Sequence, residues 1–216
     1  KPAVEVIDGG AARVIKTAAF TGNRRIATAS IWPKGYAGWA VFRELVQSPD
    51  GTLGSAFVPE MIPRCGDTAA LQFKALEGGA TGDGRAVRLE APEGRASAAL
   101  SPLPPDARIR LRVEGATGPL TLNLRASEAD PRGNEIRIVP AERRVAVTGA
   151  AKLADVDGLD RPFTMDIVLK DRILDLCVNG HRTLVSWGGE AKGDRMILSV
   201  EKGRVACDAI EVRPLQ

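Results

Sequence analysis

Short apolar runs bounded by turn-forming residues dominate this chain. Runs rich in Val, Ile, Leu and Thr recur between clusters of Gly, Pro, Asp and Asn, and apolar residues at helical spacing are almost absent. In 108–113, apolar Ile109, Leu111 and Val113 alternate with three arginines. Alternation of this kind places the two sets on opposite faces of a strand. The pattern therefore predicts an all-β protein.

The residues after position 66 are expected to form a β-sandwich, because about a dozen short candidate strands follow one another with short turns between them. We expect a two-sheet sandwich of the jelly-roll or concanavalin-like kind over 67–216. Asn179-Gly180 and Lys202-Gly203 are each expected to close a hairpin, since such residues readily adopt positive φ angles. The candidate strands are 69–76, 86–91, 97–100, 107–114, 120–126, 134–139, 143–148, 163–169, 173–178, 182–187, 195–200 and 205–212.

The first part of the chain, 1–47, is expected to form a separate sheet. Its candidate strands are 4–7, 14–20, 25–31 and 39–46. This number of strands in a stretch of this length matches a single propeller blade, and a single blade cannot bury both of its faces alone. The stretch 48–66 carries three prolines and an Asp-Gly pair, so we expect an extended linker there.

Composition and charge narrow the function classes. Of 216 residues, 44% are apolar and 26% charged, as in ordinary globular proteins. The net charge of +3 is spread along the chain, which argues against nucleic acid as a partner. No apolar run approaches the roughly 20 residues of a membrane helix, which argues against a membrane partner. The chain starts without Met beside a strand-like run, which indicates a processed or truncated product.

No cofactor or metal is expected. The glycine-rich stretch 78–84 lacks the Gly-Lys-Ser/Thr signature of a phosphate-binding loop and is expected to be a mobile loop. Cys65, Cys177 and Cys207 are too few and too widely spaced for a zinc site. Cys177 and Cys207 are expected to be small buried residues, and the single histidine, His181, to be a turn residue facing solvent.

Several segments carry motifs that resemble a known family. The runs 22–26 (Gly-Asn-Arg-Arg-Ile), 38–45 (Gly-Trp-Ala-Val-Phe-Arg-Glu-Leu) and 50–53 (Asp-Gly-Thr-Leu) resemble the closing strands of the five-bladed propeller in glycoside hydrolase family 32. The run 165–184, with its Val-Asn-Gly turn, and the last strand, 210–215, are similar to the C-terminal sandwich of the family. These segments occur in the order that the family has.

The resemblance implies part of a retaining enzyme that cleaves or transfers fructosyl units. The family carries its nucleophile, acid/base and third acid in Asn-Asp-Pro, Arg-Asp-Pro and Glu-Cys motifs of its N-terminal blades, and this sequence contains none of the three. Catalytic residues are therefore expected to be absent here and supplied by a missing N-terminal part or a partner propeller chain. The alternatives are a non-catalytic carbohydrate-binding module and a purely structural domain.

Carbohydrate is the expected ligand. Trp32, Tyr36 and Trp39 fall within eight residues and are the candidate substrate-binding residues, because sugar rings stack on aromatic side chains. Packing of Trp39 in the core is the alternative. The arginines at 108, 110 and 112 are expected to coat a solvated sheet face, with ligand binding as the alternative. Asp171 and Asp175 lie about 13 Å apart along a strand, too far for a catalytic pair.

Overall fold

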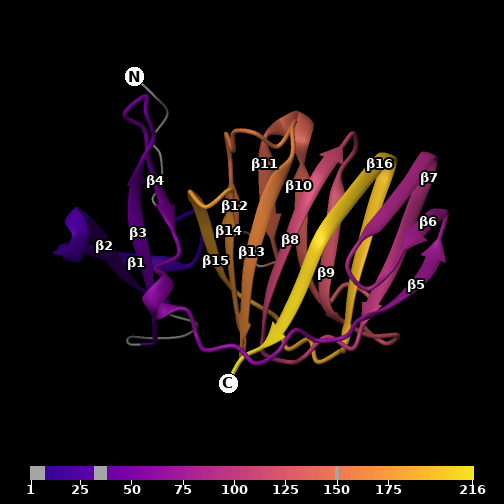
Figure 1. Ribbon diagram of the computed structural model, residues 1–216, viewed down its shortest axis with the longest axis horizontal. Coiled ribbons are helices and arrows are strands. Elements are labelled where there is room, and N and C mark those ends of the chain that lie inside the picture. The colour runs from indigo at the N-terminus through magenta and orange to yellow at the C-terminus, as the bar shows by residue number, and fades with distance from the viewer. Residues whose placement is uncertain (1–7, 32–37, 149–150) are drawn as a thin grey trace.

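The computed structural model describes residues 8–31, 38–148 and 151–216, and the regular structure in these ranges is almost entirely strand (Figure 1). The all-β prediction with a sandwich is confirmed. The helices in the described ranges are three-residue 3-10 turns, and none is long and apolar enough to cross a membrane. The elements are β1 (Ala12–Phe20), η1 (Thr21–Asn23), β2 (Arg24–Ile31), β3 (Trp39–Gln47), β4 (Leu53–Ala56), η2 (Pro59–Met61), β5 (Gln72–Glu77), β6 (Gly79–Gly82), β7 (Val87–Ser101), β8 (Ala107–Ala116), β9 (Leu120–Ala126), β10 (Asn134–Val139), η3 (Pro140–Glu142), β11 (Arg144–Val147), β12 (Ala151–Leu153), β13 (Phe163–Lys170), β14 (Ile173–Val178), β15 (Arg182–Trp187) and β16 (Arg195–Pro214).

Two long strands, β7 and β16, run through both layers of the sandwich. The first half of β16 pairs with β9, whereas its second half pairs with β8, and β7 follows β16 along both halves. Both strands turn over at the same end of the sandwich (Figure 1), where Gly94 has a φ of 74° and Lys202 a φ of 46°. Layer A therefore contains β15, β14, β13, β8, β16, β7 and β6, and layer B contains β12, β11, β10, β9, β16, β7 and β5.

The core lies between the two layers. Alternate residues of β8 and β13, such as Leu111 and Ile167, point inward from layer A, and alternate residues of β9, such as Leu122, point inward from layer B. These side chains are at most 3% exposed. Removing such apolar surface from water is the main favourable contribution to folding.

The hairpin expected at Lys202-Gly203 is wrong. The runs on its two sides pair with β9 and β8 and not with each other. The turn residues were recognised correctly, but they carry the chain from one layer to the other. The candidate strands 86–91 and 97–100 likewise form the single strand β7.

The hairpin at Asn179-Gly180 is confirmed. Asn179 and Gly180 have φ angles of 51° and 66°. The amide of His181 donates to the carbonyl of Val178 at 3.2 Å, and β14 pairs with β15. Positive φ at both central residues is the conformation of a type I′ turn.

The N-terminal sheet is a four-stranded antiparallel meander, in the order β1-β2-β3-β4. Strand β4 falls inside the stretch 48–66, which was expected to be an extended linker, and it pairs with β3. The glycine-rich stretch expected to be a loop also contributes a strand, β6, which pairs with β7. The candidate strand 4–7 lies outside the described residues.

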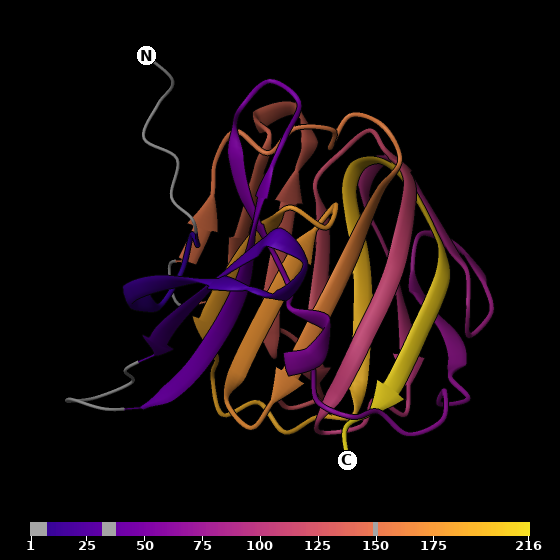
Figure 2. The ribbon, with the colours of Figure 1, turned by 60° about the vertical axis from the view of Figure 1, so that its left-hand side comes forward.

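One face of the N-terminal sheet packs on the outer face of layer A (Figure 2). Ala29, Ile31 and Val41 from the sheet form one buried cluster with Ile173 of β14 and Val185 of β15. A blade-like sheet was expected to need a separate partner for its faces. The sandwich itself covers this face, so the same chain provides that partner.

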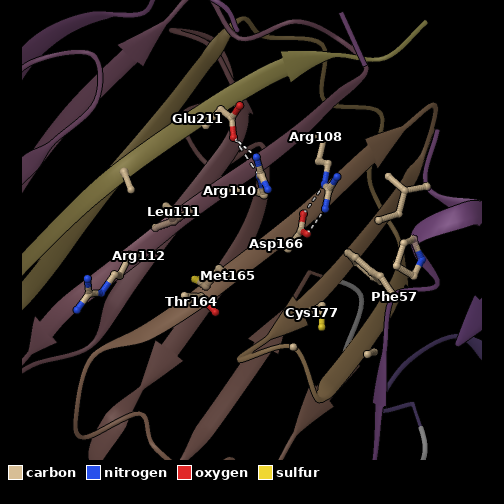
Figure 3. A pocket seen from close by; sticks show the side chains of 15 residues that line it. Phe57, Arg108, Arg110, Leu111, Arg112, Thr164, Met165, Asp166, Cys177 and Glu211 are labelled. Carbon is tan, nitrogen blue, oxygen red and sulfur yellow. Dashed lines mark hydrogen bonds and ion pairs between the residues drawn. The ribbon is translucent and has the colours of Figure 1, made fainter. Parts of the chain in front are cut away.

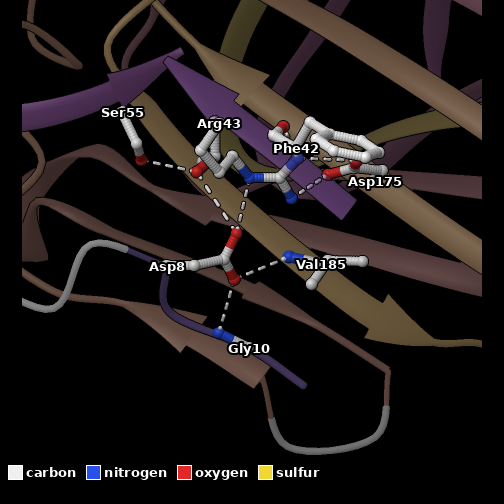
Figure 4. A network of polar contacts seen from close by, with 8 residues as sticks. Asp8, Gly10, Phe42, Arg43, Ser55, Asp175 and Val185 are labelled. Atoms are coloured by element: carbon white, nitrogen blue, oxygen red, sulfur yellow. Dashed lines mark hydrogen bonds and ion pairs between the residues drawn. The ribbon is translucent and has the colours of Figure 1, made fainter. Parts of the chain in front are cut away.

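An ion network at this junction is centred on Arg43 (Figure 4). The Arg43 side chain is 3% exposed and donates from Nε to Asp8 Oδ2 at 2.9 Å. Its two Nη atoms donate to the carboxylate of Asp175 at 3.0 and 2.6 Å. Asp8 also accepts from the hydroxyl of Thr183 and from the amide of Val185, both at 3.2 Å. Burial raises the pKa of Asp175 to about 6, against the opposing effect of the Arg43 guanidinium.

Replacing Arg43 by Met is expected to destabilise the chain by about 3–5 kcal/mol, because two buried carboxylates then lose their cation. The control is Arg24→Met, since Arg24 pairs with Glu44 and Glu60 at the surface of the same sheet. That change should cost far less stability, because solvent screens exposed ion pairs. Denaturant unfolding of both variants measures the difference. Equal losses of stability would show that the buried network does not hold the sheet in place.

Candidate functional site

The outer face of layer A is covered at one side and open at the other. The N-terminal sheet covers β14 and β15, whereas β8, β13 and the second half of β16 form the floor of an open cavity of about 640 Å³ (Figure 3). Figure 3 shows charged side chains of three neighbouring strands gathered on this floor. We take this cavity as the candidate site.

Strand register brings the charged side chains of the floor together. Arg110 of β8 lies opposite Asp166 of β13 on one side and Glu211 of β16 on the other. Arg108 donates to both carboxylate oxygens of Asp166, at 2.9 and 2.6 Å. Arg110 donates to Glu211, at 3.0 Å from Nε and also from Nη2. Arg112 pairs with Glu114 at 2.9 Å. The floor is thus a row of arginine–carboxylate pairs.

The charges of the floor are balanced. Hydrogen bonding from Arg110 lowers the pKa of Glu211, and hydrogen bonding to Asp166 raises the pKa of Arg108. Both effects favour the ionised forms of Glu211 and Arg108. The floor therefore offers many hydrogen-bond donors and acceptors with little net charge.

An apolar wall stands beside this floor. It comes from the segment that follows β4 and contains Phe57, Pro59 and Ile62. Phe57 also faces the Arg43 guanidinium, at 5.6 Å from its ring centroid. Cys177 lies in the floor near the wall, and burial raises the pKa of its thiol to about 11. Because the thiol stays protonated at neutral pH, it acts here as an apolar contact and not as a nucleophile.

The aromatic residues proposed from the sequence are placed as follows. Trp32 and Tyr36 lie outside the described residues. Trp39 is 48% exposed, so it does not pack in the core of the described residues. It lies in a smaller cleft of about 170 Å³ between the N-terminal sheet and the sandwich. Its role in binding sugar stays a prediction.

The arginine row was expected to be a solvated face, and this is confirmed for Arg110 and Arg112, whose side chains are 49% and 51% exposed. Sequence reasoning did not find Asp166, Glu211 or Phe57 as neighbours of this row. The sequence predicted strands at 163–169 and 205–212. It did not show which strands lie beside β8.

The other residues considered from the sequence are two cysteines, the histidine and two aspartates, and their surroundings are as follows. Cys177 and Cys207 are buried, as predicted, and burial raises the pKa of Cys207 to about 12. His181 is half-buried, and its Nδ1 lies 3.0 Å from the carbonyl oxygen of Asn179 in the same turn. Asp171 lies in the turn between β13 and β14, while Asp175 is held by Arg43. Among the described residues, no cluster of His, Cys, Asp or Glu could hold a metal ion.

Comparisons by sequence find no relative. No protein-family model matches the chain, and no curated protein matches it.

Comparisons by structure find enzymes and a binding module. The chain is similar to exo-inulinase from Aspergillus awamori, with a TM-score of 0.60 and 11% identity over 97% of this chain and 44% of that one. It is similar to a glycoside hydrolase family 32 protein from Bifidobacterium adolescentis, with a TM-score of 0.53 and 18% identity over 97% of this chain and 32% of that one.

This chain has the fold of the C-terminal part of a family 32 glycoside hydrolase. It spans less than half the length of the two enzymes. A third similar structure is the carbohydrate-binding module CBM66 from Bacillus subtilis, with a TM-score of 0.55 and 10% identity over 65% of this chain and 94% of that one. The sandwich is therefore a fold that occurs both within family 32 enzymes and as a binding module.

The Arg110–Glu211 pair should make stability depend on pH. Because the pKa of Glu211 is lower in the folded chain than the 4.5 of a free glutamate, the pair stabilises the fold above that pH. The contribution is lost as the pH falls through the lowered pKa. Urea unfolding at about pH 7 and about pH 3 should show Glu211→Gln less stable than the parent at the higher pH, with a smaller difference at the lower pH. A stability difference that stays constant between the two pH values would contradict this account.

Proposed function

We propose that this chain is the non-catalytic C-terminal part of a family 32-like glycoside hydrolase and that its open sandwich face binds carbohydrate. The catalytic acids are then supplied by an N-terminal propeller part or by a partner propeller chain. The observation that supports carbohydrate binding most strongly is the floor of paired arginines and carboxylates beside an apolar wall.

The chemistry of the floor suits a neutral polyhydroxyl ligand. A sugar hydroxyl both donates and accepts hydrogen bonds, so two neighbouring hydroxyls can bond at once to the carboxylate and the guanidinium of one pair. Asp166 with Arg108, and Glu211 with Arg110, present two such pairs on adjacent strands. The apolar C–H face of a sugar ring can pack on Phe57. Charged ligands gain less here, because each cation already has an anion beside it.

The structural similarities support both halves of the proposal. The family 32 enzymes share this fold over 97% of the chain, which supports a role as part of such an enzyme. The carbohydrate-binding module is covered over 94% of its own length, which supports an independent binding function for the sandwich. A module that binds carbohydrate without an attached enzyme is therefore the second candidate function.

The N-terminal sheet supports a propeller neighbour. Its face away from the sandwich carries Ile26, Phe42 and Val46, which are only half-buried. Val14 and Phe20 of β1 are 61% and 37% exposed. Apolar residues gathered on one sheet face are typical of an interaction surface, and an adjacent blade is the partner that the family resemblance implies. In that assembly Trp32 and Tyr36 are proposed to approach the sugar.

The proposal that the open sandwich face binds carbohydrate is tested by Arg110→Ala. This change removes the cation from the middle of the floor and should weaken binding of inulin or levan about ten-fold or more, as expected for the loss of a charge-assisted hydrogen bond. The matched control is Arg137→Ala, since Arg137 pairs with Glu201 on layer B much as Arg110 pairs with Glu211. Affinity electrophoresis or calorimetry measures the binding. Equal effects of the two changes would place the sugar elsewhere.

The proposal that this chain is non-catalytic is tested by measuring the release of fructose. Retaining hydrolysis needs two carboxyl groups about 5–5.5 Å apart, one of them with a raised pKa. Asp166 and Glu211 each accept hydrogen bonds from an arginine, and the bonding from Arg110 lowers the pKa of Glu211. The chain alone should therefore release no fructose from inulin, levan or sucrose. Release of fructose that disappears on changing Asp166 or Glu211 to the amide would contradict the proposal.

A further inference from the structure

We infer that the open cavity and the smaller cleft beside Trp39 form one groove that binds a neutral oligosaccharide chain across the sandwich and the N-terminal sheet. This inference rests on the proposed function and adds to it the length of the ligand. The cavity of the floor would hold one end of the chain, and Trp39 would hold a more distant sugar unit.

The two spaces share a wall. Phe57 and Ile62 line the open cavity on one side and the cleft beside Trp39 on the other. The segment that carries them follows β4 and lies over the outer face of β13 and β14 (Figure 2). The two spaces therefore adjoin at Phe57 and Ile62, and a chain that passes over these two side chains would reach from the cavity to the cleft.

The two spaces also share a floor. Alternate residues of β13 face outward, so Thr164 and Asp166 lie in the cavity, and Val168 and Lys170 lie in the cleft. On the neighbouring strand, the residues that pair with Asp166 and Lys170 are Cys177 and Ile173, and they divide between the two spaces in the same way. The outward row of β13 from Thr164 to Lys170 is about 20 Å long, at about 3.3 Å per residue. That length exceeds one sugar ring several times over.

The charges of the groove favour a neutral chain throughout its length. Lys170 in the cleft pairs with Asp106 at 2.6 Å, and Asp175 pairs with Arg43 at 2.6 Å. The pairs on the cavity floor are balanced in the same manner. Each of these charged side chains already has a partner of opposite charge, so none of them is left to pair with an acidic or basic polymer. Paired groups and apolar patches in alternation match the hydroxyls and C–H faces of a neutral sugar chain.

Trp39 is placed to bind the distant unit. It begins β3, and its side chain is 48% exposed although it lines the cleft. A large exposed aromatic side chain at the rim of a cleft offers a flat apolar surface on which a sugar ring can stack. Val41, two residues further along β3, lines the same cleft and is buried, so the strand beneath Trp39 is fixed against the sandwich.

The test compares short and long ligands on the whole chain. Calorimetry is carried out with fructose and sucrose as short probes and with inulin and levan as long ones. The parent should bind at least one long probe more tightly than the short ones. Trp39→Ala should weaken binding of that long probe roughly five-fold, on the scale of an aromatic stacking contact, and should leave the short probes unchanged. Arg110→Ala should weaken both classes.

The matched control is Leu53→Ala, because Leu53 is 52% exposed on the same sheet but lines neither space. It should change no affinity, and thermal unfolding should show that all three variants are folded. The groove is refuted, with the proposed function intact, if the parent binds short and long probes equally, or if Trp39→Ala affects both classes alike or neither. The proposed function itself fails if no probe binds, or if Arg110→Ala binds every probe as the parent does. If no probe binds but the chain associates with a family 32 propeller chain, and Trp39→Ala weakens that association, the groove is a protein interface.

Discussion

The buried contact of Arg43 with Asp8 and Asp175 fixes the position of the N-terminal sheet, and the candidate site depends on that position. Arg43 comes from β3, Asp175 from β14, and Asp8 from the segment before β1, so one guanidinium holds three parts of the chain. Burying three charges is costly, and only close hydrogen bonding compensates the loss of water. The arrangement therefore favours one docking geometry over others that would leave a carboxylate unpaired.

That geometry creates the cavity. The outer face of layer A alone would be an open sheet, on which arginine–carboxylate pairs contribute little and bind weakly. Docking of the N-terminal sheet brings the segment after β4, with Phe57, against β13 and β14. A wall then stands beside the charged floor, and polar and apolar groups converge on one concave space, as in most ligand sites. The sandwich supplies the polar groups, and the segment after β4 supplies the apolar wall.

Much of the fold follows from the sequence, because strand formation is a local matter. Alternation at Ile109, Leu111 and Val113 identified both β8 and its inward face. Asn179-Gly180 identified a true hairpin, since the positive φ angles and the pairing of its two arms are both local. Lys202-Gly203 gave a similar local signal, yet its arms pair with β8 and β9. Turn residues determine that the chain reverses, and contacts with distant strands determine what each arm pairs with.

The site could be predicted only in part, for the same reason. The arginine row on β8 was visible in the sequence, but Arg108 and its partner Asp166 are separated by 58 residues. Glu211 is 101 residues from Arg110. Trp39 was a candidate sugar-binding residue with packing in the core as the alternative, and its position at the start of β3 leaves it 48% exposed at the edge of the junction. Residue type indicated the chemistry, and only the register of β13, β8 and β16 brought the groups together.

The central claim is that carbohydrate binds on the open part of layer A beside the docked N-terminal sheet. The most direct measurement is a crystal structure of the chain with a short inulin oligosaccharide bound. The account predicts sugar hydroxyls within hydrogen-bond distance of the Arg108–Asp166 and Arg110–Glu211 pairs, with a ring against Phe57. Sugar bound instead on the outer face of layer B, over Thr121 and Ser199, would contradict the account.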